Sequence, residues 1–128
     1  MKQTMEKWFK EALFYAFDLK TEDYTKYISE EFVMHLDGKV FNFKQWVHHI
    51  VGLKALMKSY KFTFDDFVIQ EDKIASSYIV HATKKDGTEL DIRVIAIFKI
   101  KNGKFIYCDE LTHLLRGPES DKNLASQD

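Results

Sequence analysis

Hydrophobic residues recur at helical spacing in the first half of the chain and alternate with polar residues along the second half. Residues 3–19 place their apolar side chains on one broad side of a helix, which predicts a helix that is covered over much of its circumference. Thr21 is typical of an N-cap and predicts a second, short helix. Asn42, with Gln45 three residues later, predicts a capping box at the start of a third helix.

The remaining segments have the patterns of strands and tight turns. Asp37-Gly38 predicts a hairpin of two short strands within residues 32–41, and Asp86-Gly87 and Asn102-Gly103 predict two further hairpins. Alternation of apolar and polar residues predicts four long strands, at residues 62–70, 73–84, 88–101 and 104–116. Because helices precede the long strands, we expect an α+β fold.

The two later turns predict how the last three strands pair. Counting outward from two-residue turns gives two rows of side chains across one otherwise apolar face of the sheet. The rows are His81, Ile92, His113 and Ser77, Ala96, Asp109. We therefore expect imidazoles and a carboxylate to face an apolar hollow. A single β-bulge would exchange the faces, and Glu110 and Thr112 would then replace Asp109 and His113 inside.

A carboxylate and imidazoles on an apolar face indicate acid–base chemistry. Burial raises the pKa of a carboxyl group, so the predicted catalytic residues are Asp109, His113 and His81, with Asp37 as an alternative carboxylate. His81 and His113 lie roughly 10 Å apart by strand spacing, too far to ligate one ion together, and we expect no metal and no cofactor. The predicted ligand-binding residues are His49, His35, Trp46, Tyr107, Phe98, Ser77 and Glu110.

The opposite face of the predicted sheet is also rich in apolar residues. A soluble monomer rarely leaves so large a patch in water. The simplest cover is a second copy packed sheet to sheet, so we expect a homodimer. The predicted interface consists of Tyr78, Val80, Ile95, Ile97, Ile106 and Cys108.

Composition narrows the class of protein and of partner. The chain has 128 residues and is 45% hydrophobic, which favours one domain over residues 1–116 and a flexible tail over residues 117–128. A net charge of −1 argues against nucleic acid as a partner, and charged residues interrupt every apolar run, so we expect neither a secretory signal nor a membrane partner. The single cysteine, Cys108, suits a reducing, cytoplasmic location.

The order of these elements resembles the nuclear transport factor 2-like superfamily, which includes ketosteroid isomerases and SnoaL-like polyketide cyclases. Three segments look like a bacterial branch of that superfamily: FVMHLDGK at residues 32–39, WVHHI at 46–50 and CDELTHLL at 108–115. The resemblance implies a cone-shaped barrel, in which a strongly bent, mixed or antiparallel sheet wraps around N-terminal helices. It also implies a pocket for a hydrophobic small molecule and pairing through the outer sheet face.

The resemblance carries one catalytic position and lacks two others. Asp37 matches the proton-abstracting aspartate of ketosteroid isomerases, but Leu13 stands where they have a tyrosine, and Ile95 or Ala96 where they have a second acid. The donors that stabilise an enolate in those enzymes are thus missing. We expect a small-molecule-binding domain that performs isomerase, cyclase, hydratase or other lyase chemistry on a carbonyl-containing hydrophobic substrate. The alternative is a non-catalytic ligand carrier or a protein-interaction dimer module.

Overall fold

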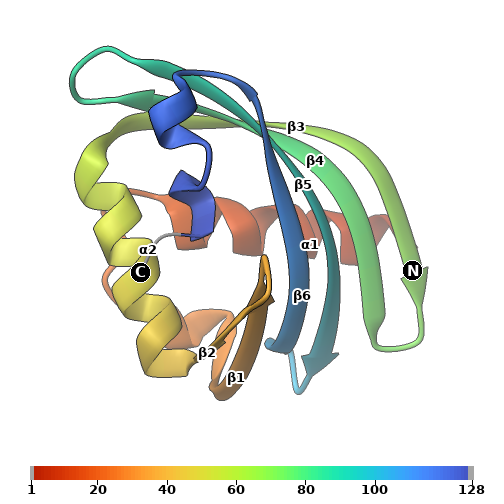
Figure 1. Ribbon diagram of the computed structural model, residues 1–128. Helices are drawn as coiled ribbons and strands as arrows, with labels where there is room; N and C mark the ends of the chain where they lie inside the picture. The colour runs from red at the N-terminus through yellow and green to blue at the C-terminus, as the bar shows by residue number, and fades with distance from the viewer. Residues whose placement is uncertain (1, 127–128) are drawn as a thin grey trace.

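The computed structural model describes residues 2–126 and consists of two helices on the concave side of one curved sheet (Figure 1). The helices are α1 (Lys2–Phe17) and α2 (Phe43–Leu56). The strands are β1 (Ile28–Leu36), β2 (Lys39–Asn42), β3 (Met57–Gln70), β4 (Lys73–Lys84), β5 (Glu89–Lys101) and β6 (Lys104–Arg116). Three 3-10 turns complete the chain: η1 (Tyr24–Lys26), η2 (Glu119–Asp121) and η3 (Leu124–Ser126).

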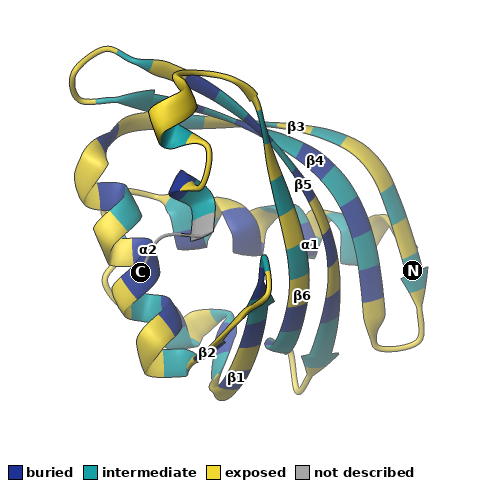
Figure 2. Ribbon diagram, viewed as in Figure 1, coloured by how far each residue is buried: buried dark blue, intermediate teal, exposed yellow. Residues whose placement is uncertain are grey.

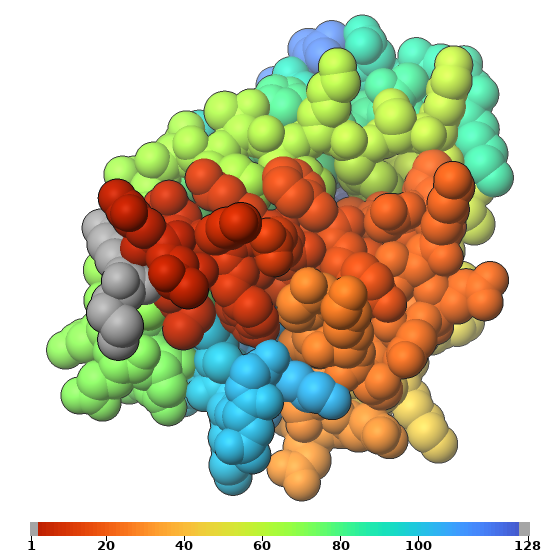
Figure 3. Space-filling view, turned by 180° about the vertical axis from the view of Figure 1, so that it is seen from behind, coloured from red at the N-terminus to blue at the C-terminus, as the bar shows by residue number. Residues whose placement is uncertain are grey.

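The six strands form a single mixed sheet in the order β2-β1-β6-β5-β4-β3. All neighbouring strands are antiparallel except β1 and β6, which are parallel. The sheet is bent but not closed, and α1 crosses its concave side (Figure 1). Viewed from behind, α1 lies at the surface between residues of β3 and the turn that joins β5 to β6 (Figure 3). The predicted α+β fold with a bent, mixed sheet is confirmed.

Local capping signals explain how the helices begin. The side chain of Asn42 accepts a hydrogen bond from the Gln45 backbone at 2.9 Å, and the Gln45 side chain accepts one from the Asn42 backbone at 2.9 Å, so the predicted capping box is confirmed. The predicted second helix is wrong, because only the 3-10 turn η1 forms and Asp23, not Thr21, caps it. The chain then enters β1, whose Ile28 pairs with Phe105 of β6.

Alternating burial along β4 and β5 defines the two faces of the sheet (Figure 2). On β5 the buried residues are Leu90, Ile92, Val94, Ala96 and Phe98. We call the face that they share, which packs against the helices, the cavity face, and the opposite face the outer face. The cavity face carries most of the hydrophobic core, together with aromatic side chains from α1 such as Phe9.

The connection between β4 and β5 contains one residue more than a two-residue turn. Gly87 donates a backbone hydrogen bond to Lys84 at 2.9 Å, and Lys84 pairs with Thr88, so the loop comprises residues 85–87. Gly87 has a φ of 92°, as in a type I turn that ends in a left-handed residue. The predicted pairing of β4 is therefore wrong by one residue: His81 lies opposite Asp91 instead of Ile92.

A β-bulge shifts β6 in the same way. The two-residue turn at Asn102-Gly103 forms as predicted, and Ile100 pairs with Phe105. The register then changes, because Lys99 pairs with Tyr107 and Ile106 is the additional residue. The side chains beyond this bulge consequently lie on the face opposite to the one predicted by the unbulged register.

These shifts correct the predicted interface as well. Tyr78, Val80 and Cys108 were predicted on the outer face, but they are buried on the cavity face. Ile95 and Ile97 do lie on the outer face, where they are 57% and 48% exposed. Their places follow from β5 itself, whose own alternation is unaffected by the two insertions.

Lys54 is a charged residue in the core and ties α2 to the end of α1. Its side chain is 8% exposed, and its Nζ donates hydrogen bonds to the backbone oxygens of Ala16 at 3.3 Å, Asp18 at 2.8 Å and Thr21 at 3.3 Å. Burial lowers the pKa of Lys54, and the Asp18 carboxylate opposes this effect. The ammonium group thus satisfies carbonyls that the helix end leaves without partners.

We predict that Lys54→Met lowers the free energy of unfolding by about 2 kcal/mol, because several charge-assisted hydrogen bonds are lost while the apolar stem is kept. Chemical denaturation monitored by circular dichroism measures this change. Lys44→Met provides the control, since Lys44 lies on the same helix and is exposed. Equal stability of the Lys54→Met variant and the wild type would contradict the capping role.

Candidate active site in the sheet cavity

A mostly apolar hollow of about 80 Å³ lies between the two helices and the cavity face of the sheet. Helix α1 contributes small and apolar side chains to its wall, α2 contributes Trp46 and His49, and the strands contribute the rest. The polar side chains that reach it from the sheet are few: Tyr60, Tyr78, Glu110 and Thr112. The apolar lining includes Ala12, Leu13, Phe32, Met34, Leu36, Ile50, Val80, Val94 and Phe98.

Glu110 is the acidic residue in this apolar lining. It lies on β6 opposite Ala96, so its side chain enters the cavity between strands of hydrophobic residues. Burial, and then the nearby charge of Asp37, raise the pKa of Glu110 to about 7, while a hydrogen bond from Cys108, with Sγ 3.7 Å from Oε1, opposes the rise. A carboxyl group with this pKa exchanges protons readily at neutral pH.

Asp37 is fixed beside Glu110 by the tight turn between β1 and β2. Its backbone N–H donates to the Glu110 carbonyl at 3.0 Å, and its Oδ1 accepts from the Thr112 backbone N–H at 2.7 Å. The Thr112 hydroxyl donates to Oδ2 of the same carboxylate in a short hydrogen bond. Asp37 is absent from the cavity lining, so its carboxylate acts on Glu110 through its charge.

Two tyrosines add hydroxyl groups to the cavity wall. The Tyr60 hydroxyl is buried and has no hydrogen-bond partner among the described residues, which is unusual for a buried polar atom. Burial raises the pKa of Tyr60, so the hydroxyl keeps its proton at neutral pH. Burial also raises the pKa of Tyr78, and the charge of Glu110 adds to the effect. Both hydroxyls are therefore potential hydrogen-bond donors to a bound molecule.

The structure brings some of the predicted site residues to the cavity and separates others from it. Those that line it are His49, Trp46, Phe98 and Glu110. His49 stacks on Phe41, with ring centroids 5.3 Å apart. Asp109 and His113 are exposed on the outer face, so the prediction that they enter the hollow is wrong. The alternative with Glu110 and Thr112 inside is the arrangement found, because Ile106 forms a bulge.

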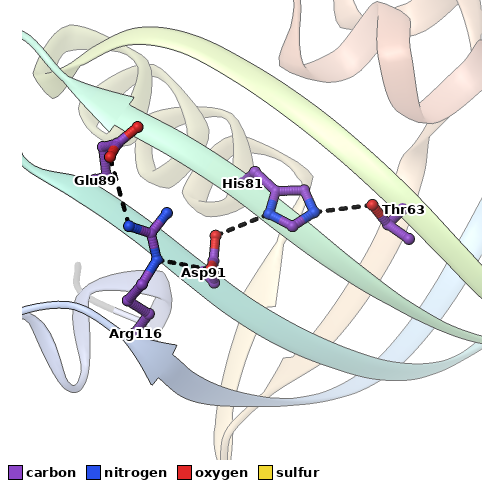
Figure 4. Close-up of polar contacts among 5 residues, drawn as sticks. All are labelled: Thr63, His81, Glu89, Asp91 and Arg116. Carbon is purple, nitrogen blue, oxygen red and sulfur yellow. Dashed lines mark hydrogen bonds and ion pairs between the residues drawn. The ribbon is translucent and has the colours of Figure 1, made fainter.

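His81 also lies on the outer face, in a chain of polar contacts that crosses three strands (Figure 4). Its Nε2 lies 2.8 Å from the Thr63 hydroxyl, and its Nδ1 lies 2.8 Å from Oδ1 of Asp91. Arg116 donates from Nε to the other Asp91 oxygen at 2.8 Å, and hydrogen bonds from Arg116 and His81 lower the pKa of Asp91. This chain pairs its own charges and has no contact with the cavity lining.

The three other predicted ligand residues also lie outside the cavity. His35 and Tyr107 contact each other with ring centroids 5.4 Å apart, and Lys99 Nζ lies 4.6 Å from the centroid of the Tyr107 ring. Ser77 accepts a hydrogen bond from Arg93 at 2.9 Å on the outer face. None of the three belongs to the residues that line the hollow.

Sequence reasoning missed the two tyrosines of the cavity. Tyr78 was assigned to the outer face because the extra residue at Gly87 was not counted, and Tyr60 was assigned to a helix that ends at Leu56. The signal that identifies them is the alternation of β3 and β4 once the three-residue loop is recognised.

Two searches of residues 2–126 gave no result. They contain no group of three or more His, Cys, Asp or Glu side chains arranged to hold a metal ion. No helix in this part of the chain combines the length and the apolar character needed to cross a membrane.

No protein-family model matches the chain. Among curated proteins, an uncharacterised protein of Schizosaccharomyces pombe is 29% identical over 113 residues, which covers 88% of this chain and 87% of the yeast protein. The similar sequence therefore includes both helices and the long strands. It also extends the sequence type that we compared with bacterial proteins to a eukaryote.

Solved structures define the class of fold. AclR, provisionally assigned as a hydroxylase of Streptomyces galilaeus, superposes with a TM-score of 0.74 at 14% identity, over 90% of this chain and 82% of its own. IdmH, provisionally assigned as a polyketide cyclase of Streptomyces antibioticus, gives 0.64 at 16% identity, over 80% and 90%. An NTF2-like protein of unknown function from Exiguobacterium sp. 255-15 gives 0.66 at 18% identity, over 80% and 95%.

The chain therefore has the nuclear transport factor 2-like fold, in the form shared with SnoaL-like polyketide cyclases. The resemblance predicted from the order of elements is confirmed at the level of the fold. Identities of 14% to 18% carry no residue roles from these structures to this chain.

We predict that Glu110→Gln removes a pH dependence of folding stability. Because the pKa of Glu110 is raised on folding from 4.5 to about 7, the folded state holds a proton that the unfolded state releases. The stabilisation is complete below pH 4.5 and is lost as the pH rises through 7, by up to about 3 kcal/mol. Urea denaturation of both proteins between pH 4.5 and 8 measures it, and parallel curves would contradict the assignment.

Proposed function

We propose that the cavity binds a small, mostly apolar carbonyl compound and that Glu110 transfers a proton to and from the carbon next to the carbonyl. The single observation that carries this proposal is a carboxyl group with a pKa of about 7 inside an apolar hollow. At neutral pH a large share of this group is ionised and can accept a proton, and the same group can return it to another carbon. The reaction class is an isomerisation or a cyclisation that begins with an enolate.

Other side chains support this chemistry. Removal of a proton leaves negative charge on the carbonyl oxygen, and a positioned hydroxyl that donates to that oxygen stabilises it. We assign this role to Tyr60, because its buried hydroxyl retains its proton and has no partner among the described residues. Trp46 and Phe98 offer flat apolar walls for the body of the molecule. The provisional assignments of the neighbours AclR and IdmH are compatible with chemistry on such compounds.

We further propose that the protein forms a homodimer through a revised part of the outer face. We define the outer patch as Ile95, Ile97 and Leu111, of which Ile95 pairs directly with Leu111. All three are about half exposed or more, and Leu111 reaches 64%. Arg93 bonds Asp65 at 2.7 Å beside the patch, so nearby charges are compensated within the chain and a second copy can approach without repulsion.

We predict that the wild type catalyses exchange of deuterium from solvent into the carbons next to the carbonyl of cyclohexanone, and that Glu110→Gln slows this exchange about 100-fold or more. Proton NMR in D₂O measures the rate. The rate of the wild type should rise with pH around 7, because only the ionised carboxylate accepts a proton.

Matched variants separate the proposed roles in the same assay. Asp109→Asn removes the neighbouring carboxylate on the outer face and should leave the rate unchanged, whereas Tyr60→Phe should lower it about 100-fold. Loss of activity in Asp109→Asn with full activity in Glu110→Gln would contradict the proposal. Binding of cyclohexanone without exchange would indicate the non-catalytic ligand carrier.

We predict that Ile97→Glu converts the dimer to a monomer, because it places a charge in the centre of an apolar interface. Analytical ultracentrifugation should give a mass near 15.1 kDa for the variant and twice that value for the wild type. Val68→Glu is the control, since Val68 is an equally exposed β-branched residue on β3, outside the outer patch. A wild type that sediments as a monomer would overturn the proposed dimer.

A further inference from the structure

The segment that follows β6 returns to the cavity and fills part of it. Leu124 in η3 is only 3% exposed and packs in a cluster with Met57, Ala82 and Leu90. Leu124 and its neighbour Ala125 belong to the lining of the hollow. In Figure 1 this segment passes between α2 and the sheet, on the concave side. The C-terminal segment, which we define as residues 118–126, is thus part of the cavity wall.

The attachment of the C-terminal segment to the rest of the fold is slight. It consists of two 3-10 turns of three residues each, η2 and η3, and turns of this length have little stability of their own. One ion pair links it to the sheet: Lys84 Nζ lies 3.2 Å from Oδ1 of Asp121. Apart from that pair, the buried side chain of Leu124 is its main anchor.

The chain reaches this segment through a glycine that a larger residue would disturb. Gly117 has a φ of +147°, and a Cβ at this position would lie 2.6 Å from Cδ2 of Leu90. The chain therefore turns away from β6 close to the cluster that holds Leu124. A bend at Gly117 allows the segment to leave the cavity without movement of β6.

The size of the hollow shows why such movement matters. Its volume of about 80 Å³ is roughly half that of an engineered cavity of about 150 Å³ that binds one benzene ring. With Leu124 in place, the hollow accommodates only a few non-hydrogen atoms. A ring-sized carbonyl compound needs the space that Leu124 occupies.

We propose that Leu124 is a specificity-determining residue that competes with the ligand for the cavity, so that a ring-sized ligand binds by displacing the C-terminal segment. This inference rests on the ligand site proposed above. Smaller side chains at position 124 then admit ring-sized ligands more readily. The strength of the segment's attachment sets which ligands can enter.

The experiment measures binding of cyclohexanone to the full chain by chemical-shift changes in two-dimensional NMR spectra, including that of the Trp46 indole. Leu124→Ala should bind at least tenfold more tightly than the wild type. Leu115→Ala is the matched control, because Leu115 is an exposed leucine of β6, and its affinity should remain within twofold of the wild type. Asp121→Asn, which removes the ion pair and leaves the core intact, should bind about threefold more tightly.

A second measurement on the wild type needs no substitution. Saturation with cyclohexanone should speed hydrogen exchange of the backbone amides of residues 119–126, because the segment leaves the cavity. Equal affinities of the wild type and Leu124→Ala, unchanged protection of this segment, or no binding to any variant would each overturn the inference. If Leu124→Ala binds more tightly but no variant exchanges deuterium into the ketone, the proposed proton transfer fails and the role of Leu124 stands.

Discussion

The register of β4 and β6 against β5 decides which side chains reach the cavity. Side chains alternate between the faces of a sheet, so one additional residue in a strand or its connection moves every later side chain to the other face. Gly87 ends a three-residue loop on one side of β5, and Ile106 forms a bulge on the other. Together they place Tyr78 and Glu110 inside and His81 outside.

The chemical character of Glu110 follows from this placement and from one long-range connection. A carboxylate surrounded by hydrocarbon loses hydration, and a second negative charge nearby makes ionisation still less favourable. Asp37 supplies that second charge from a hairpin more than 70 residues away in the sequence, and its carboxylate is held in place by both hydrogen-bond donors of Thr112. The same contacts fasten the β1–β2 hairpin to β6.

The order and type of most elements could be predicted from local signals. The Asn42–Gln45 capping box and the Asp37-Gly38 turn depend on residues within a few positions of each other, and both formed as predicted. The faces of β4 and β6 could not be predicted, because Asp86-Gly87 fits both a two-residue and a three-residue loop, and the bulge at Ile106 has no residue signature. Lys54 in the core was equally invisible, since the carbonyls that it bonds lie more than 30 residues earlier.

The position of β6 in the middle of the sheet has a consequence for how the molecule assembles. It is the last strand to be synthesised, yet it lies between β1 and β5 and provides the parallel pairing that joins the two halves of the sheet. Until β6 leaves the ribosome, β1 and β5 each present an open edge that another chain can pair with. The final step of folding must therefore follow translation of nearly the whole chain, and the nascent protein passes through a stage in which it depends on protection from aggregation.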